Sequence, residues 1–227
     1  MGKDIIFVGG SKGGVGKSMV SSALVDFLTK NGESVYLIET DTSNADVYKS
    51  HKDSVDFDLF NLDEAQGWID MINRLSEHPD KTFVINSAAR VITGVTEHGS
   101  LLMDCVEAAD RRVVTIWVIN PQRDSLELLT DYMPVMDKSV VHVFKNMFFG
   151  PKEDFILFDE SGLAEQIEKT GGRDFLFPEV ARRVANQMNI RRYSVDKGLK
   201  EMPLGNKVEL ERWRKRCAEV FEEALKK

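Results

Sequence analysis

A glycine-rich loop between an apolar run and a helical pattern is the feature that most restricts the fold of this chain. Residues 5–8 form a short, mostly β-branched apolar run, which is typical of a buried strand. The loop at residues 11–18 follows, and apolar residues then recur at helical spacing over residues 19–28. A strand that passes through glycines directly into a helix predicts a βα unit whose backbone N–H groups converge at the helix N-terminus.

The same alternation continues along the chain. Further strands are predicted at residues 35–38, 83–85, 113–119, 140–144 and 175–177. Helices are predicted at residues 65–75 and 206–226, and the rest of the acidic stretch 45–80 shows no regular pattern. Strands that alternate with helices predict an α/β fold of three layers, a mostly parallel twisted sheet flanked by helices. No linker interrupts the pattern, so we expect one domain, residues 1–227.

The charge is unevenly distributed along the chain. The formal net charge is -7, but residues 181–227 carry 13 Lys or Arg against 7 Asp or Glu. This basic C-terminal region indicates a surface for polyanions, or alternatively an ordinary solvated helix face. No apolar run is long enough to span a bilayer, and no leader pattern precedes the first strand, so we expect a cytoplasmic protein. Cys105 and Cys217 stand apart and form no metal or redox motif.

The loop has the residues that a phosphate-binding site needs. It consists of Ser11, Lys12, Gly13, Gly14, Val15, Gly16, Lys17 and Ser18. Glycines let the backbone close around phosphate oxygens, Lys17 can reach the β and γ phosphates, and the Ser18 hydroxyl can ligate Mg²⁺. We therefore predict ATP and Mg²⁺ as cofactors. A dinucleotide site is excluded because Met19 and Val20 stand where its third glycine would be. A glycine-rich loop with two solvated lysines is the remaining alternative.

The loop departs from the general P-loop pattern in an informative way. The segment from Lys12 to Ser18 resembles the deviant Walker A motif of the ParA/MinD family, in which a second lysine precedes the glycines. The resemblance implies a P-loop NTPase fold and a nucleotide sandwich dimer in which Lys12 contacts the partner's nucleotide. It also includes Met19, the residue after the motif, among the nucleotide-binding residues.

Carboxylates follow the second predicted strand. Glu39 and Asp41 resemble the Asp-x-Asp of the family at this position, with Glu39 in place of the first Asp. We expect Asp41 to position the attacking water and, with Glu39 and Ser18, to hold the metal. A helix cap or a solvated acid is the alternative for Asp41. Asn86 stands where the resemblance implies a Walker B Asp, so we predict slow hydrolysis and propose that Glu39 restores the missing charge.

Two later segments extend the resemblance. Asn146, after the strand predicted at 140–144, matches the position where the family reads the adenine edge. Pro178, after the strand predicted at 175–177, matches a turn that packs against the base. An amide has both a donor and an acceptor, which suits adenine. Each of these residues is also a common turn former, which is the alternative interpretation.

The resemblance covers residues 3 to about 205 and implies a ParA-like ATPase that uses slow hydrolysis as a switch for DNA or plasmid partition or stability. In the family, the ATP-bound dimer binds nonspecific DNA, a membrane or a protein, and a partner protein stimulates hydrolysis. We favour DNA because the C-terminal region is basic, through Arg182, Arg183, Arg191, Arg192, Arg212, Arg214, Lys215 and Arg216. The predicted C-terminal helix carries five Glu, which disfavours an anionic membrane. A MinD-like positioning ATPase and a P-loop small-molecule kinase or synthetase remain open as alternatives.

Overall fold

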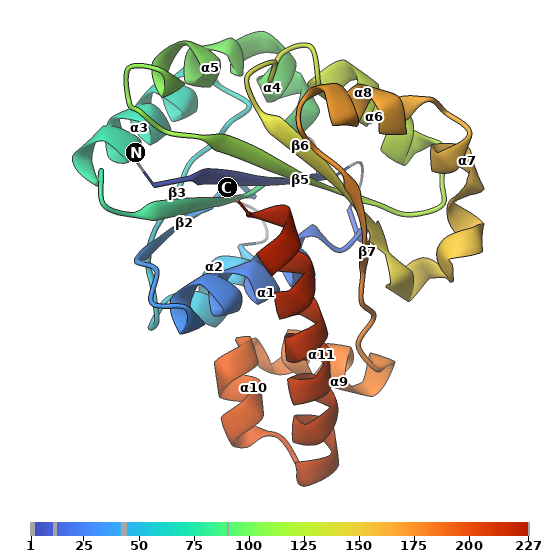
Figure 1. Cartoon of the computed structure of the whole chain (residues 1–227). Helices are drawn as coiled ribbons and strands as arrows, with labels where there is room; N and C mark the ends of the chain where they lie inside the picture. The colour runs from blue at the N-terminus through green and yellow to red at the C-terminus, as the bar shows by residue number, and fades with distance from the viewer. Residues whose placement is uncertain (1–2, 11–12, 42–44, 90, 227) are drawn as a thin grey trace.

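A single parallel sheet organises the chain (Figure 1). The computed structural model describes residues 3–10, 13–41, 45–89 and 91–226. The seven strands are β1 Ile5–Gly10, β2 Val35–Glu39, β3 Asp56–Leu59, β4 Thr82–Asn86, β5 Val113–Ile119, β6 Val140–Asn146 and β7 Asp174–Phe177. Their order is β3-β2-β4-β1-β5-β6-β7, and every neighbouring pair is parallel. The predicted α/β fold of three layers is confirmed.

Helices cover both faces of the sheet. In the first half of the chain they are α1 Lys17–Lys30, α2 Asp46–His51, α3 Ala65–Glu77, α4 Val91–His98, α5 Ser100–Val106 and α6 Asp124–Tyr132. In the second half they are α7 Ile156–Asp159, α8 Leu163–Lys169, α9 Arg182–Arg191, α10 Val195–Glu201 and α11 Leu204–Ala224, with short 3-10 helices η1 Met147–Phe149 and η2 Lys152–Phe155. No helix in the described ranges is both long enough and apolar enough to cross a membrane.

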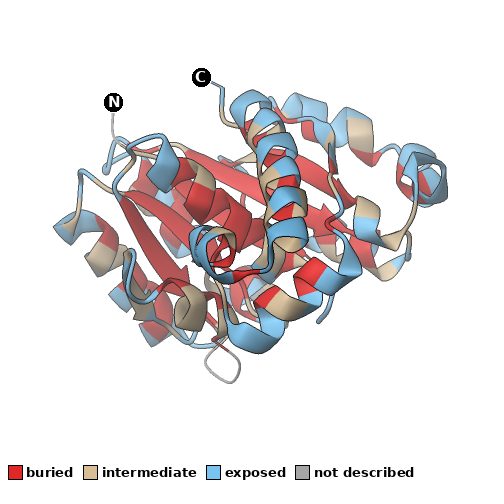
Figure 2. Ribbon diagram, turned by 90° about the horizontal axis from the view of Figure 1, so that it is seen from below, coloured by how far each residue is buried: buried red, intermediate tan, exposed pale blue. Residues whose placement is uncertain are grey.

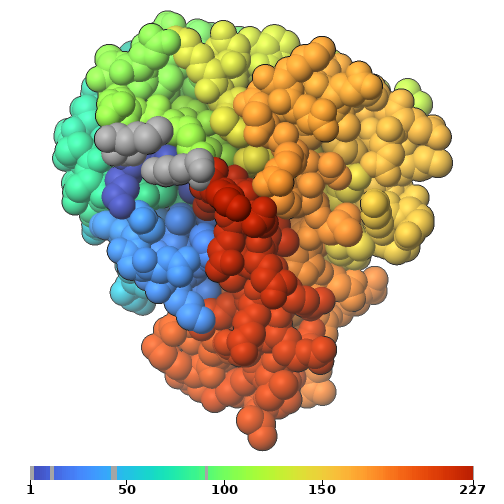
Figure 3. All heavy atoms as spheres, in the orientation of Figure 1, coloured from blue at the N-terminus to red at the C-terminus, as the bar shows by residue number. Residues whose placement is uncertain are grey.

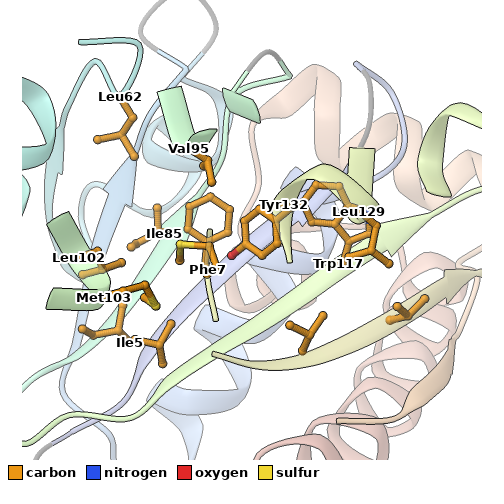
Figure 4. Close-up of a cluster of buried hydrophobic side chains, with 14 of the residues drawn as sticks. Ile5, Phe7, Leu62, Ile85, Val95, Leu102, Met103, Trp117, Leu129 and Tyr132 are labelled. Carbon is orange, nitrogen blue, oxygen red and sulfur yellow. The ribbon is translucent and has the colours of Figure 1, made fainter. Parts of the chain in front are cut away.

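Alternation along the strands produces two apolar cores. Ile5 and Phe7 of β1 point to the face covered by α3 to α8, where Phe7 packs against Tyr132 and Tyr132 against Trp117 (Figure 4). Ile6 and Val8 point to the other face, which α1, α2 and α9 to α11 cover. The central strands are buried on both faces, as Figure 2 shows in red.

Residues 45–80 contain two elements that the sequence pattern did not predict. α2 and β3 both lie there, so the strand predicted at 83–85 is the fourth along the chain, β4. β3 has the sequence Asp-Phe-Asp-Leu and lies at the edge of the sheet, where its side chains are partly or fully exposed. Asp58 of this strand accepts a hydrogen bond from the Tyr36 hydroxyl at 2.8 Å and forms an ion pair with Arg74. Pairing with β2, rather than an apolar run, makes this segment a strand.

Candidate nucleotide-binding site

The glycine loop lies between β1 and α1, as the sequence predicts. Gly14 has φ 85° and Gly16 has φ 107°, in the left-handed region that favours glycine. A Cβ on Gly16 would lie 2.3 Å from Nδ2 of Asn146, so neither the backbone conformation nor the space admits a side chain there. Gly16 caps α1, and the N–H groups of the first turn of a helix have no acceptor within that helix. This arrangement suits a phosphate group.

Lys17 is the first residue of α1 and is buried, with 7% of its surface exposed. Burial lowers its pKa to about 8, and the nearby negative charge of Asp41 acts against that shift. A lysine removed from water in this way gains more from a phosphate anion than a solvated one does, because the interaction is screened less. Ser18, the next residue, is exposed.

The ends of β2 and β4 are tied together by a chain of buried hydrogen bonds. Nδ2 of Asn86 donates to Oε1 of Glu39 at 2.9 Å, and its Oδ1 accepts from the Ser21 hydroxyl of α1 at 2.8 Å. The backbone N–H of Asp41 also donates to Oε1 of Glu39, at 3.2 Å. Glu39 has no exposed surface, and its burial raises its pKa to about 7, while the Asn86 hydrogen bond acts in the opposite direction.

A cavity of about 440 Å³ joins these elements. Of the residues proposed from sequence, it is lined by Gly13, Gly14, Gly16, Lys17, Ser18, Met19, Asp41, Asn146 and Pro178. Val15 is buried and Glu39 lies behind Asn86, so neither lines the cavity. Ser11 and Lys12 lie outside the described residues. The described chain contains no cluster of three or more His, Cys, Asp or Glu that would hold a metal by itself.

Asn146 uses its amide within the protein. Nδ2 donates to the carbonyl oxygen of Val15 at 2.9 Å, and Oδ1 accepts from the backbone N–H of Phe148 at 3.1 Å. The side chain therefore fixes the glycine loop from the end of β6. Pro178 lies across the same cavity, and its carbonyl oxygen accepts a hydrogen bond from Nε1 of Trp213 at 2.8 Å.

Several lining residues were not proposed from sequence. They are Asp46, Ser87, Ala89, Phe148, Phe149, Val180, Ala185, Asn186, Asn189 and Trp213. Asn86, discussed above, also lines the cavity, as do Phe177 and Glu179 on either side of Pro178. Phe148 and Phe149 lie two and three residues after Asn146, which is the sequence signal that could have identified them. Asn186 and Asn189 are three residues apart on α9 and therefore share a face of that helix, but only the fold shows that this face meets the glycine loop.

The C-terminal basic residues do not all serve one surface. Arg214 makes a two-point ion pair with the buried Asp26 of α1, at 2.7 Å and 2.9 Å, and so joins α11 to α1. Nη2 of Arg216 donates to the carbonyl oxygen of Glu179 at 2.9 Å, and the guanidinium of Arg182 lies over the Phe148 ring. These three side chains have contacts within the protein.

Comparisons with known proteins agree with this geometry. The family model described as the CobQ/CobB/MinD/ParA nucleotide-binding domain matches residues 6–201. The chain belongs to this family. Protein MobD of Acidithiobacillus ferrooxidans is 48% identical to this chain over 222 residues, which is 98% of each chain.

Solved MinD structures share the fold. MinD from Aquifex aeolicus aligns with a TM-score of 0.53 at 14% identity, over 94% of this chain and 95% of that one. The septum site-determining protein MinD of Pyrococcus horikoshii OT3, complexed with Mg-ADP, aligns with a TM-score of 0.54 at 16% identity, over 96% of both chains. The resemblance to ParA/MinD proteins found in the sequence is confirmed by these matches.

Proposed function

We propose that this chain is a ParA-like ATPase that binds Mg-ATP and uses slow hydrolysis as a switch in DNA partition or stability. One observation carries the proposal: Lys17, Ser18 and Asp41 line one cavity at the carboxyl ends of the strands, beside the glycine loop. In open α/β sheets, ligands bind at this edge. The Mg-ADP in the related MinD structure supports the choice of ligand.

Each residue has a proposed role at the phosphate end. Lys17 contacts the β and γ phosphates, Ser18 and Asp41 hold the metal, and Asp41 orients the attacking water. Bound Mg²⁺ supplies positive charge that offsets the charge of the phosphates. Glu39 positions Asp41, because its Oε1 accepts a hydrogen bond from the backbone N–H of Asp41. Lys12 contacts the nucleotide of a second copy, as the ParA/MinD resemblance implies.

The base is proposed to lie at the end of the cavity near Asn146 and Pro178. One N–H of the Asn146 amide donates to Val15, and an amide nitrogen carries a second N–H that can donate to a base. Phe148 and Phe149 line the same cavity and offer apolar surface to an aromatic ring.

The proposed dimer binds nonspecific DNA and responds to a stimulating partner protein. The membrane alternative receives less support because the apolar stripe of α11 packs into the core through Leu210, Trp213 and Phe221, all without exposed surface. A small-molecule enzyme would need a cover over its substrate pocket, and the acidic stretch 45–65 is the candidate for it. This alternative receives less support because that stretch contains α2 and the edge strand β3.

Equilibrium binding of a fluorescent ATP analogue, with and without Mg²⁺, tests the proposal. We expect Mg²⁺-dependent binding, a dimer in light scattering with ATP, and slow phosphate release. Lys17→Ala should weaken binding about tenfold or more because a charged contact to phosphate is lost. Lys30→Ala, at the exposed far end of the same helix, is the matched control. Binding that is equal in the two variants would rule the site out.

A further inference from the structure

A cationic groove lies between α2 and the corner where α9 turns into α10. Its volume is about 360 Å³, and every residue that lines it is charged or a serine. The cations are Lys49, Lys52, Arg191, Arg192, Lys197 and Lys200, and the other lining residues are Ser50, Asp53, Ser54, Ser194 and Asp196. In Figure 3 the C-terminal lobe, in orange and red, lies against the blue surface of the N-terminal part of the chain.

Much of this positive charge is not neutralised by neighbouring acids. Lys200 pairs with Asp196 at 2.6 Å, and Lys49 lies 3.8 Å from Asp46. Within the described ranges, no ion pair involves Lys52, Arg191 or Arg192. The groove therefore concentrates six cations against two acids in a protein whose net charge is -7. Concave sites lined by one sign of charge focus the electrostatic field on an oppositely charged partner.

Arg192 holds an uncommon backbone conformation at this corner. It ends α9 with φ 51°, in the left-handed region, and its N–H donates to the carbonyl oxygen of Asn189 at 3.2 Å. Residues other than glycine, asparagine and aspartate rarely adopt this conformation, and it tends to occur where function requires it. The turn places Arg192 both in the groove and in a small cavity beside it.

That small cavity connects the groove with the nucleotide pocket. It is about 50 Å³, and it shares Ser50 and Arg192 with the groove. It also shares Ser18 and Asp46 with the nucleotide pocket. α2 runs along all three: Asp46, its first residue, lines the nucleotide pocket, and Lys49, one turn later, lines the groove.

We propose that this groove binds the phosphate backbone of duplex DNA and that α2 couples DNA binding to the nucleotide site. The inference rests on the proposed function and assigns the DNA surface within it. A lining of charges and hydroxyls fits phosphodiesters, which cationic side chains bind without regard to sequence. Membrane-bound amphipathic helices and the cores of protein interfaces have apolar side chains in the contact, and this lining has none.

We assign DNA to the groove in place of the C-terminal basic set that the sequence suggested. Only Arg191 and Arg192 belong to both, and Lys49 and Lys52 come from the N-terminal half of the chain. This difference provides a matched control, because Arg183, Arg212 and Lys215 are exposed and do not line the groove.

The test compares two triple variants that lose the same charge. The groove variant is Lys49→Gln, Lys52→Gln, Arg191→Gln, and the control is Arg183→Gln, Arg212→Gln, Lys215→Gln. Binding to a fluorescent duplex of about 30 base pairs is measured with ATP and Mg²⁺ over a range of salt. The groove variant should bind about tenfold more weakly or worse, with a salt slope lowered by about one for each lost phosphate contact. The control should stay within about twofold of the unmodified protein.

Other outcomes overturn the inference. Equal losses in the two variants, or an unchanged groove variant, would show that DNA is bound elsewhere. Binding to phosphatidylserine vesicles but not to the duplex would show a membrane surface instead.

Hydrogen exchange of residues 46–54 tests the coupling between the groove and the nucleotide site. We expect protection on adding nucleotide as well as on adding DNA, and protection by DNA alone would contradict the coupling. Nucleotide binding measured on the same samples separates these failures from a failure of the proposed ATP site.

Discussion

At the scale of single residues, Asn86 joins three elements beside the glycine loop. Its amide donates to Glu39 and accepts from Ser21, so it joins β4 to β2 and to α1. A carboxylate at the same position would accept from Ser21 but would have no proton for Glu39. The amide thus permits a buried acid on the neighbouring strand.

Asn86→Asp should therefore destabilise the protein in a pH-dependent way. At pH 8 it removes a buried donor and sets two carboxylates together, which we expect to cost about 2 kcal/mol. Because burial raises the pKa of Glu39 to about 7, stability from this group is present at low pH and is lost as pH rises through that value. At pH 5 one carboxyl of the pair holds a proton and can donate it, so the cost should be smaller. Urea unfolding at both pH values measures it.

The exchange of the two side chains is the control. Glu39→Gln combined with Asn86→Asp keeps one acid and one amide in contact with their positions reversed, so it should recover most of the stability lost at pH 8. An Asn86→Asp variant as stable as the unmodified protein at pH 8 would show that the Glu39 contact contributes little.

Gly16 gives a second prediction at this scale. Gly16→Ala places a Cβ at a backbone φ of 107° and 2.3 Å from the Asn146 amide, so the loop must shift. We expect a folded protein whose affinity for a fluorescent ATP analogue is about tenfold lower or worse, because backbone N–H groups no longer converge on the phosphates. Gly205→Ala, at an open position in α11, should bind like the unmodified protein. Equal affinity in both variants would mean that the loop adjusts freely.

At the scale of elements, α11 is fixed to α1 by the Arg214–Asp26 ion pair. Asp26 is 6% exposed, and burial raises its pKa while the hydrogen bonds and charge of Arg214 act in the opposite direction. Arg214→Ala leaves a buried carboxylate without its partner and should cost about 3 kcal/mol. Urea unfolding measures the loss, and Lys215→Ala, exposed on the same helix, should change little.

The double variant separates the ion pair from packing. Asp26→Asn together with Arg214→Ala removes the uncompensated charge, so its cost should be clearly below the sum of the single costs. Strict additivity would show that Arg214 contributes through its aliphatic packing instead.

The sequence predicted elements well where the apolar period decided them. β5 was predicted to the residue, and β1, β2 and β4 within two residues, because buried parallel strands are continuous apolar runs. β3 was missed because its pairing with β2, and not its composition, makes it a strand. The same difference applies to the candidate site. The glycine loop could be predicted from adjacent residues, whereas the hydrogen bond from Asn146 to Val15 depends on β6 lying beside the loop.

At the scale of the whole molecule, two buried histidines from different parts of the fold make the stability depend on pH. His51 ends α2 and contacts the Ser22 hydroxyl of α1 at 2.8 Å, and His142 lies in β6. They are 3% and 4% exposed, and burial lowers the pKa of each to about 4. Both therefore stay neutral in the folded protein at pH values where a solvated histidine would be charged.

The unfolded chain binds protons at these histidines from about pH 6.5 downward, while the folded protein binds them only near pH 4. Their contribution to stability is thus complete above about pH 6.5 and is lost as pH falls to about 4, by about 3 kcal/mol for each group. Glu39 has the opposite pH dependence, so the contribution of a histidine is best measured by comparing a histidine variant with the unmodified protein. His51→Gln should lose less stability between pH 7 and pH 4.5 than the unmodified protein in urea unfolding. Parallel pH profiles for the two proteins would show that folding leaves the pKa of His51 unchanged.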